Sequence, residues 1–479
     1  MRVAAKKSMR RAAPLLISAR LSERVSLDTT TNGKIVIRLD DRSFALGTVG
    51  AAAAARAHEL RTGLPLASLG SGRGSKELDA VVRRLARHGL LEFGLATRGG
   101  EDFLVVEPQV PDYWPHTPPL RETDTLALSR FAYMRRRGSD LVLESPRAGA
   151  LFKIRDAKIA AAVTALATPQ RVKALRRQPG FPGDALLALL LESQILFKLA
   201  ATDDAGLRAD EGGDDLVLWD FHDLLFHARS TQGRHADLLG GVYPYVGVIA
   251  PAPALRPRWP GKRIDLRRFA DAARALSPFA ALLRRRHSTR SYDAARPITL
   301  DELAHFLDGA ARVLAQARPA PEFDDGGHAV RPYPSAGASY ELELYLTINA
   351  CEGLTRGFYH YDAGAHDLAP IAVAAGELEG QLAGAAHAMG ADTPPQVLIT
   401  IAARFGRVSW KYRAIAYSLV LKDVGVLMQT LYLMATEMEL GGCAIGIVDI
   451  DRFAKMTGIA FHVEGPVGQF ALGRGAGGD

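Results

Sequence analysis

The first hundred residues alternate between strand-like and helix-like hydrophobic patterns. Apolar and polar residues alternate loosely over Lys34–Leu39, as expected of a strand with one buried face. Alanine-rich residues 49–60 predict a helix, and a second helix is predicted from Lys76, where apolar side chains recur on one stripe and arginines lie on the opposite face. Short apolar runs over 90–93 and 103–106 predict two more strands. One strand, two helices and a two-stranded wing are typical of a winged helix-turn-helix.

A looser version of this pattern follows. Residues 141–154 predict a hairpin, and two helical patterns and a short strand follow it up to residue 197. We therefore expect two small winged-helix-like modules in tandem. Module 1 covers residues 22–110 and module 2 covers residues 120–202.

Less regular segments flank these modules. Residues 1–21 are basic and lack acids, and their apolar part is interrupted by Pro14 and is too short for a signal sequence or a membrane span. We expect a flexible tail there, with an organelle-type presequence as the alternative. Residues 203–260 predict an acidic linker and a proline-rich entry segment. Within them, Trp219–His227 predicts a packed helix rather than a metal site, because its two histidines are five residues apart and do not share a helical face.

The remaining residues, 261–479, carry the longest periodic elements. Leu266–Leu283 favours a helix and Glu343–Ile348 favours a strand. Tyr412–Leu440 is apolar on almost every side, which predicts a helix that is buried, in part by a second copy of the chain. The whole chain is therefore expected to belong to the α+β class.

Composition narrows the classes of function. The 479 residues are 48% hydrophobic, which is enough to fill the cores of about three domains. The 59 Lys and Arg exceed the 52 Asp and Glu by 59 − 52, a net charge of +7 that suits an anionic cofactor or an acidic peptide and does not by itself imply nucleic acid. Cys351 and Cys443 are far apart and have no zinc spacing, so we expect no metal, no disulfide framework and a cytoplasmic location.

A basic segment supplies the clearest candidate chemistry. In Arg286–Arg290, with the sequence RHSTR, two fixed cations flank a hydroxyl and an imidazole. Alternate side chains of such a segment can face one polyanionic ligand, and arginine suits phosphate because its planar fork donates two parallel charge-assisted hydrogen bonds. Alone, such a segment is more typical of a solvated surface.

Three further motifs follow it in order. They are RPYPSAGA over 331–338, GFYHYD over 357–362 and WKYR over 410–413. Together with the basic segment they resemble the nitroreductase-like flavoproteins, and within these the SagB-type dehydrogenases, or azoline oxidases, which oxidise azolines to azoles in ribosomally made peptides. The resemblance covers about residues 219–474. It implies a central mixed or antiparallel sheet flanked by helices, FMN as the cofactor, and an obligate homodimer in which both chains complete each flavin site.

The resemblance also assigns candidate cofactor contacts. Those to the phosphate and the ribityl chain are Arg286, His287, Ser288, Arg290 and Arg474. Those to the flavin ring are Pro334, Ser335, Gly337, Ala444, Ile445 and Gly446. The small residues of these two loops would let a planar ring approach the backbone closely. Asp423 stands where a glutamate is expected in relatives, which leaves its role open.

Azoline oxidation needs a base for a ring proton as well as an acceptor for a hydride. The resemblance assigns the base to Lys411, with Tyr412 orienting it or sharing the proton. A lysine has an ordinary pKa of roughly 10.4, and burial would lower it towards neutrality. A surface Lys-Tyr pair at the start of a helix is the structural alternative.

The N-terminal modules then have three interpretations. In azole-forming enzymes such modules resemble leader-peptide-binding elements, where an extended peptide adds a strand to the wing edge. This favours a heterocycle-containing precursor peptide as the substrate, with a cyclodehydratase as a further partner. Structural packing is the second interpretation. DNA binding through Arg83, Arg84 and Arg87 is the third, although neither module carries the dense basic stripe of a nucleic-acid reader.

Two other functions are compatible with the sequence. An NAD(P)H-dependent nitroreductase of small molecules needs no separate Rossmann motif, since nicotinamide stacks on the flavin directly, but it has no use for a peptide clamp. A winged-helix regulator with a flavin-like sensor domain is the non-enzymatic alternative, and the presence of Lys411 and Tyr412 argues against it.

Overall fold

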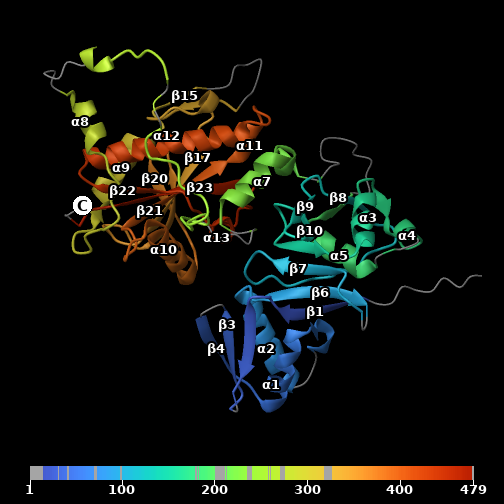
Figure 1. The fold of residues 1–479 in the computed structure, drawn as a ribbon. Coiled ribbons are helices and arrows are strands. Elements are labelled where there is room, and N and C mark those ends of the chain that lie inside the picture. The colour runs from blue at the N-terminus through green and yellow to red at the C-terminus, as the bar shows by residue number, and fades with distance from the viewer. Residues whose placement is uncertain are drawn as a thin grey trace, which may run out of the picture. The chain divides into compact units, whose positions relative to one another are not determined.

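The structure is a computed structural model of the 479-residue chain (Figure 1). It describes residues 15–476 apart from 31, 40–41, 70–72, 98–99, 179–180, 182, 200–210, 212, 233, 235–239, 257, 259, 270–275 and 318–325. The chain divides into two compact units, Met1–Ala236 and Asp237–Asp479. The boundary between them falls inside the predicted linker and entry segment.

Unit 1 is built on a seven-stranded antiparallel sheet in the order β5-β1-β6-β7-β11-β10-β9. Its strands are β1 (Leu15–Leu21), β5 (Leu64–Pro65), β6 (Leu91–Thr97), β7 (Leu104–Pro108), β9 (Tyr133–Arg137), β10 (Asp140–Glu144) and β11 (Ala150–Ile154). The prediction of a flexible tail over residues 1–21 is wrong for its last seven residues. They form β1, where Ala19 and Leu21 are buried, while residues 1–14 lie outside the described part.

The same sheet corrects the prediction of two separate modules. Strand β7 belongs to predicted module 1 and β11 to predicted module 2, yet the two are hydrogen-bonded neighbours from Leu104↔Ile154 to Pro108↔Ala150. The predicted hairpin of module 2, β10 and β11, therefore extends the sheet of module 1. The N-terminal residues share one sheet instead of forming two closed units.

Smaller elements complete unit 1. A three-stranded sheet consists of β2 (Val25–Thr29), β3 (Lys34–Leu39) and β4 (Arg42–Thr48), and a second one of β12 (Gln170–Arg171), β8 (Thr125–Leu128) and β13 (Leu196–Lys198). The helices are α1 (Ala51–Ala57), α2 (Arg73–Arg87), α3 (Ala157–Ala165), α4 (Val172–Leu175), α5 (Asp184–Glu192), α6 (Asp214–Val217) and α7 (Phe221–Ser230). The apolar stripe predicted on α2 is confirmed, because Leu78, Val82 and Leu85 are fully buried.

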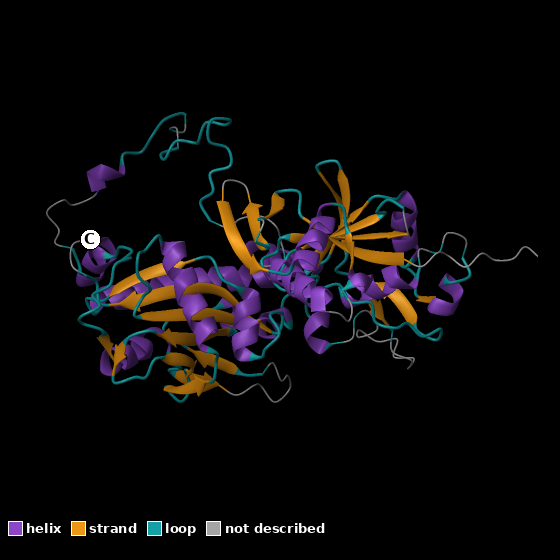
Figure 2. Cartoon of the chain, turned by 90° about the horizontal axis from the view of Figure 1, so that it is seen from below, coloured by secondary structure: helices purple, strands orange, loops and turns teal. Residues whose placement is uncertain are grey.

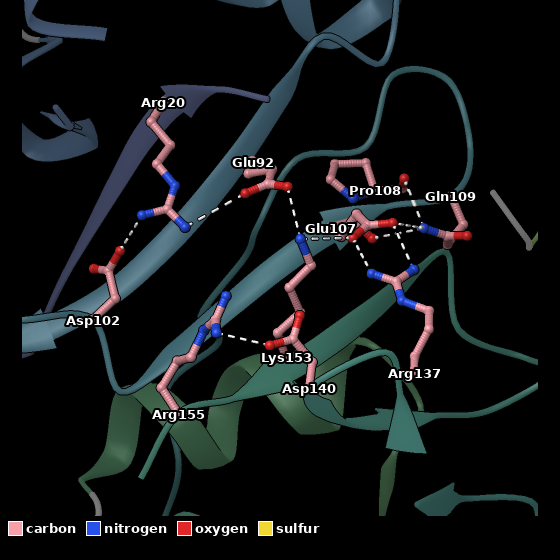
Figure 3. Close-up of polar contacts among 10 residues, drawn as sticks. All are labelled: Arg20, Glu92, Asp102, Glu107, Pro108, Gln109, Arg137, Asp140, Lys153 and Arg155. Carbon is pink, nitrogen blue, oxygen red and sulfur yellow. Dashed lines mark hydrogen bonds and ion pairs between the residues drawn. The ribbon is translucent and has the colours of Figure 1, made fainter. Parts of the chain in front are cut away.

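A chain of ion pairs crosses the sheet of unit 1 (Figure 3). Lys153 on β11 is 6% exposed, and its Nζ lies 2.9 Å from both Glu92 Oε1 on β6 and Glu107 Oε2 on β7. Arg20 on β1 extends the chain at one side through Glu92, and Arg137 on β9 extends it at the other through Glu107. Because buried charges are costly unless they are paired, these contacts fix the β7–β11 junction in one register.

Unit 2 contains a six-stranded antiparallel sheet in the order β20-β19-β17-β21-β23-β22. Its strands are β17 (Leu342–Ile348), β19 (Gly357–Asp362), β20 (Asp367–Ile371), β21 (Val397–Arg404), β22 (Gly441–Ile445) and β23 (Glu464–Gly473). Strand β14 (Ile298–Thr299) pairs with β18 (Cys351–Glu352), and β15 (Ala315–Ala317) pairs with β16 (His328–Val330). The helices are α8 (Pro278–Arg285), α9 (Leu300–Ala311), α10 (Ala375–Met389), α11 (Phe405–Ser409), α12 (Ala416–Glu437) and α13 (Ile450–Thr457). The expectation of an α+β fold with a helix-flanked antiparallel sheet in this region is confirmed.

Helices cover both faces of this sheet (Figures 1 and 2). Successive strand residues point to opposite faces. Gly442 of β22 therefore faces Ala435 of α12, whereas Cys443 packs in a cluster with Leu382 of α10. The helix predicted over 266–283 is helical among the described residues only in the 3₁₀ turn Leu266–Phe269 and in α8. Helix α8 starts at Pro278 because Ser277 caps it and Pro278 occupies its first turn.

Helix α12 is the long apolar helix predicted over 412–440, and it starts four residues later than predicted because Ala414 has a positive φ of 56°. By length and composition it could cross a membrane, a test that core helices of soluble proteins also pass. It packs against α8, α9, α11 and the strands β22 and β23. Of its most apolar stretch 33% is buried within one chain, and most of the other apolar side chains of the helix are half-buried. The exposed positions of α12 are Ser418, Lys422, Gly425, Gln429 and Glu437.

Candidate functional site

The basic segment Arg286–Arg290 lies along β22. The backbone N–H of Thr289 donates to the carbonyl of Gly442 at 2.9 Å, and Thr289 is buried. A Cβ on Gly441 would lie 2.6 Å from Cγ2 of Thr289, so glycine at this position permits the close approach. The structure therefore brings together the basic segment and the glycine-rich strand, two motifs more than 150 residues apart in the chain.

The two predicted phosphate-binding arginines are available as cations. Within the described residues, neither Arg286 nor Arg290 forms an ion pair with an acid, and Arg290 is exposed. The guanidinium of Arg286 lies 5.0 Å from the ring centroid of Tyr432 on α12, a cation–π distance. His287 is exposed, and its Nδ1 lies 3.0 Å from the carbonyl oxygen of Arg285. Two guanidinium groups that no acid neutralises, on one short segment, suit a phosphate.

Tyr432 joins the basic segment to β22. Its hydroxyl lies 2.7 Å from Ser288 Oγ and accepts a hydrogen bond from the backbone N–H of Ala444 at 2.8 Å. The ring of Phe470 on β23 holds the Tyr432 ring in an edge-on contact at 5.0 Å. Beyond Ala444, Ile445 is buried and Gly446 is exposed with open space around it. Four of the predicted cofactor residues, Arg286, Ser288, Arg290 and Ala444, thus belong to one surface region, which we name the basic cluster together with Tyr432.

Arg474 is engaged elsewhere. Its guanidinium lies 2.6 Å from Oε1 and 2.8 Å from Oε2 of Glu302, a bidentate pair at the start of α9. Its backbone N–H donates to Oε1 of Gln396 at 2.9 Å. The described contacts thus use this arginine to tie the end of β23 to α9, so it is not a spare cation, and its predicted role at a phosphate stays a prediction.

The second group of predicted residues gathers at the turn Ser335–Ala338. Gly337 has a φ of +58°, and a Cβ on it would lie 2.4 Å from the hydroxyl of Tyr412 and 2.9 Å from Nζ of Lys411. Nζ of Lys411 donates to the carbonyl of Gly337 at 3.3 Å. The predicted catalytic pair therefore lies directly against the predicted flavin turn, although 74 residues separate Lys411 from Gly337. We name this group the Lys-Tyr cluster.

Acidic side chains support this turn. Oδ2 of Asp423 on α12 accepts hydrogen bonds from Ser335 Oγ at 2.9 Å and from the backbone N–H of Ala336 at 2.8 Å. Ser335 Oγ also lies 3.2 Å from Oε2 of Glu341, which is fully buried. Burial, reinforced by the neighbouring Asp423 carboxylate, raises the pKa of Glu341 to about 7. The role of Asp423 that the sequence leaves open is thus to anchor the turn.

The two clusters lie at different positions along α12. Tyr432 and Asp423 are nine residues apart, which corresponds to about 13 Å along a helix at 1.5 Å per residue. Lys411 is exposed within one chain, so this chain alone does not supply the desolvation expected of a catalytic lysine. A polar cavity of about 910 Å³ borders the far side of the turn at Ser339 and Tyr340, but neither Lys411 nor Tyr412 lines it.

These features fit FMN in three respects. The basic cluster offers two arginines that have no acidic partner among the described residues and suit a phosphate, Gly337 lacks a side chain that would hinder the approach of a flat ring, and the small residues Ala444 and Gly446 lie at the end of β22. Among the described residues, no group of three or more His, Cys, Asp or Glu side chains is arranged to hold a metal ion.

Two residues of the candidate site, Tyr432 and Glu341, are not predicted from the sequence. Tyr432 stands in the apolar helix as one more large residue, and only its hydroxyl hints at a polar role. Glu341 directly precedes an apolar strand and lies six residues after Ser335, a spacing that carries no recognisable motif. Both are defined by their contacts in the folded chain, which no local pattern encodes.

Comparison with known proteins finds two matching family models and a curated relative. Residues 283–474 match the model of the nitroreductase family, and residues 126–236 match that of the cyanobactin oxidase ThcOx. A nitroreductase of Methanocaldococcus jannaschii is 32% identical over 165 residues, which are 34% of this chain and 76% of that protein.

Similar solved structures are more distant. A nitroreductase from Ralstonia eutropha is 21% identical, covering 44% of this chain and 88% of the other, with a TM-score of 0.33. The McbBCD microcin synthetase complex of E. coli, solved with truncated pro-MccB17, is 19% identical, covering 56% of this chain and 97% of the matched one, with a TM-score of 0.39. The sequence matches indicate an oxidoreductase, and they establish that the chain belongs to the nitroreductase family.

Proposed function

We propose that this protein is an FMN-dependent dehydrogenase that oxidises thiazoline or oxazoline rings to thiazoles or oxazoles in a ribosomally synthesised peptide. The observation that carries the proposal is the contact of Lys411 and Tyr412 with Gly337. It joins a candidate base to the turn that the resemblance assigns to the flavin. The match of residues 126–236 to a cyanobactin oxidase model supports a peptide substrate.

Each cluster has a distinct task in this proposal. Arg286 and Arg290 hold the phosphate, while Ser335, Gly337 and the end of β22 face the ring. FMN, when bound, supplies the acceptor for the hydride that leaves one azoline carbon. Lys411 accepts the proton that leaves the neighbouring carbon, and Tyr412 orients Lys411. Removal of one hydride and one proton creates the second ring double bond.

A homodimer would complete the site. Tyr432 of the basic cluster and Asp423, which anchors the turn of the Lys-Tyr cluster, are about 13 Å apart along α12, and apolar side chains of this helix such as Leu421 and Val426 are only half-buried in one chain. A second copy packed on α12 would bring the basic cluster of one chain to the Lys-Tyr cluster of the other and would shield Lys411 from water. A buried lysine amine titrates closer to neutrality and is then a competent base.

Strand β9 is the candidate docking element for the precursor peptide. It is an edge strand whose only partner among the described strands is β10. It carries Arg136, which forms no ion pair with a described residue, whereas its neighbours Arg135 and Arg137 pair with Glu144 and Glu107. An extended acidic leader peptide could add a strand there. A cyclodehydratase, which makes azolines, is the expected second partner.

The deciding experiment is a visible spectrum of the purified protein under anaerobic conditions, followed by addition of an azoline-containing peptide. We expect a flavin spectrum that the peptide bleaches, and formation of the azole by mass spectrometry. Lys411→Ala should retain the flavin and lose azole formation, whereas Lys422→Ala, at an exposed lysine on α12, should keep both.

Other outcomes of the same experiment would favour the alternative functions. Rapid bleaching by NAD(P)H alone, without reaction of the peptide, would favour an NAD(P)H-dependent nitroreductase of small molecules. A protein that cannot be loaded with FMN would contradict both enzymes.

A further inference from the structure

The proposed reaction leaves one buried acid without a task. Glu341 is fully buried and Asp423 is 6% exposed. Ser335 Oγ lies within hydrogen-bonding distance of both carboxyl groups. A serine hydroxyl carries one proton, so it can donate to only one of them at a time.

Few other hydrogen-bond donors or cations reach these two carboxyl groups. The backbone N–H of Ala336 donates to Asp423, and Oε1 of Glu341 has no hydrogen-bond partner among the described residues. Besides Ser335, the backbone N–H of Glu341 itself favours the ionised carboxylate, but burial outweighs both. No basic side chain in the described residues forms an ion pair with Glu341 or Asp423. The arginines around the turn have other partners: Arg331 donates to the carbonyl of Leu342, Arg407 to that of Ser339, and Arg404 pairs with Glu343.

The groups that surround Glu341 therefore favour its neutral form. Asp423 on α12 places a negative charge near the Glu341 carboxyl group, and the buried phenol of Tyr333 lies in the preceding segment. From β21, the backbone N–H of Arg404 donates to the backbone carbonyl of Glu341 at 2.9 Å and not to its carboxyl group. The next acid along the chain is Glu343 on β17, which pairs with His360 and Arg404. Two adjacent buried carboxylates without a cation are costly, and one shared proton removes that cost.

We propose that Glu341 is a positioning residue that loses a proton as the pH rises through neutrality, and that loss of this proton releases the Ser335–Ala338 turn from Lys411. The inference rests on the proposed function, because it concerns the same flavin-facing turn. Gly337, Ala338 and Tyr340 all have positive φ, at 58°, 53° and 46°. Two of these residues are not glycine, so the turn holds a disfavoured conformation and depends on its anchors at Asp423. Repulsion between Glu341 and Asp423 would weaken those anchors and displace the carbonyl that receives Lys411.

The proton can be observed without flavin or substrate. Infrared difference spectra of the protein across neutral pH should contain the carbonyl band of a protonated buried carboxyl that disappears as the pH rises. Glu341→Gln should remove this band. Asp423→Asn should move its disappearance to lower pH, because the neighbouring negative charge that favours the protonated form is gone. Glu343→Gln, two residues further along the chain and with its own partners, should leave the band unchanged.

The positioning role has its own readout. In the FMN-loaded protein, the pH dependence of azole formation and of the visible circular dichroism should show an inflection near neutrality that Glu341→Gln abolishes and Glu343→Gln retains. A band or an inflection that persists in Glu341→Gln would overturn the proposal. If the protein binds no FMN, the proposed function fails, yet the infrared titration still decides whether Glu341 holds the proton.

Discussion

The hydroxyl groups of Ser288 and Tyr432 lie 2.7 Å apart and join the basic segment to the long helix α12. The Tyr432 hydroxyl also receives the backbone N–H of Ala444. One side chain thus sets the position of two candidate flavin-binding segments at once.

Replacing Tyr432 with phenylalanine should weaken FMN binding. The change keeps the ring but removes both hydrogen bonds, and loss of a buried partner costs about 1–3 kcal/mol. We expect the dissociation constant for FMN, measured by fluorescence titration, to rise by roughly one to two orders of magnitude at about 1.4 kcal/mol per tenfold. Tyr359→Phe on β19, whose hydroxyl donates to the carbonyl of Thr355, is the control. Equal affinities for the two variants would contradict the role of Tyr432.

Replacing Gly337 with alanine should reduce azoline oxidation more than stability. The new Cβ would clash with the Tyr412 hydroxyl and crowd Lys411. Gly458→Ala is a matched control, since Gly458 also has a positive φ, of 74°, but a Cβ added to it would meet nothing within 4 Å. Both variants should lose about 1–2 kcal/mol of unfolding free energy from backbone strain. Turnover should fall only in Gly337→Ala, and a loss in both would show that strain alone is responsible.

Replacing Lys153 with methionine should destabilise unit 1. The substitution leaves Glu92 and Glu107 without their shared cation in a buried position. Removing one partner of a buried ion pair typically costs about 3–5 kcal/mol. Urea unfolding of the full chain should show this loss in its N-terminal transition. Arg155→Met, which removes a half-exposed pair with Asp140, should cost at most about 1 kcal/mol.

Acid should remove the contribution of Glu107. Burial raises the pKa of this carboxyl, but hydrogen bonds from Arg137 and Lys153 outweigh burial and lower it to about 2. Because the folded-state pKa lies below the ordinary value of 4.5, the stabilisation is present above pH 4.5 and is lost as the pH falls towards 2. The unfolding free energies of the native chain and of Glu107→Gln should therefore converge across this range. A difference of at most roughly 3 kcal/mol is expected at neutral pH.

The homodimer can be tested at Gly425. This residue lies on the uncovered face of α12 with open space around it, so an arginine there fits a single chain but not a packed helix interface. Gly425→Arg should shift the mass measured by light scattering from dimer to monomer and should lower FMN retention. Gly384→Arg on α10, equally exposed and open, should remain dimeric. A monomeric native protein would rule out the shared site.

The local hydrophobic pattern predicts individual helices and strands better than it predicts which strands pair with one another. The stripe of α2, the β10–β11 hairpin and the long helix α12 follow from residue periodicity, because each is set by neighbours in the chain. The strand Leu15–Leu21 escapes such patterns, since Pro14 and the basic flank outweigh the alternation of Ile17, Ala19 and Leu21. Its burial depends on β6, about 75 residues later, which no local window contains.

The residues of the candidate site likewise fall into those that the sequence identifies and those that only the contacts of the folded chain reveal. Motif order points to the basic segment and the pair Lys411 and Tyr412 as candidates. In the structure the first lies beside β22 and the second beside the turn at Gly337. Arg474 carries the right charge, but Glu302 already neutralises it, and this pairing cannot be read from the sequence. Tyr432 contacts Ser288, 144 residues earlier in the chain, and Glu341 contacts Ser335, six residues earlier. These two spacings share no sequence signature.

The β7–β11 junction also limits how the protein can be divided. A chain cut between residues 110 and 120, at the point where the hydrophobic pattern suggests a boundary, would leave β7 with an unpaired edge and expose the apolar side chains of Val105 and Val106. An open apolar edge recruits strands from other molecules. Such fragments should aggregate, so a shortened form of unit 1 should keep all seven strands of this sheet, residues 15–154, in one chain.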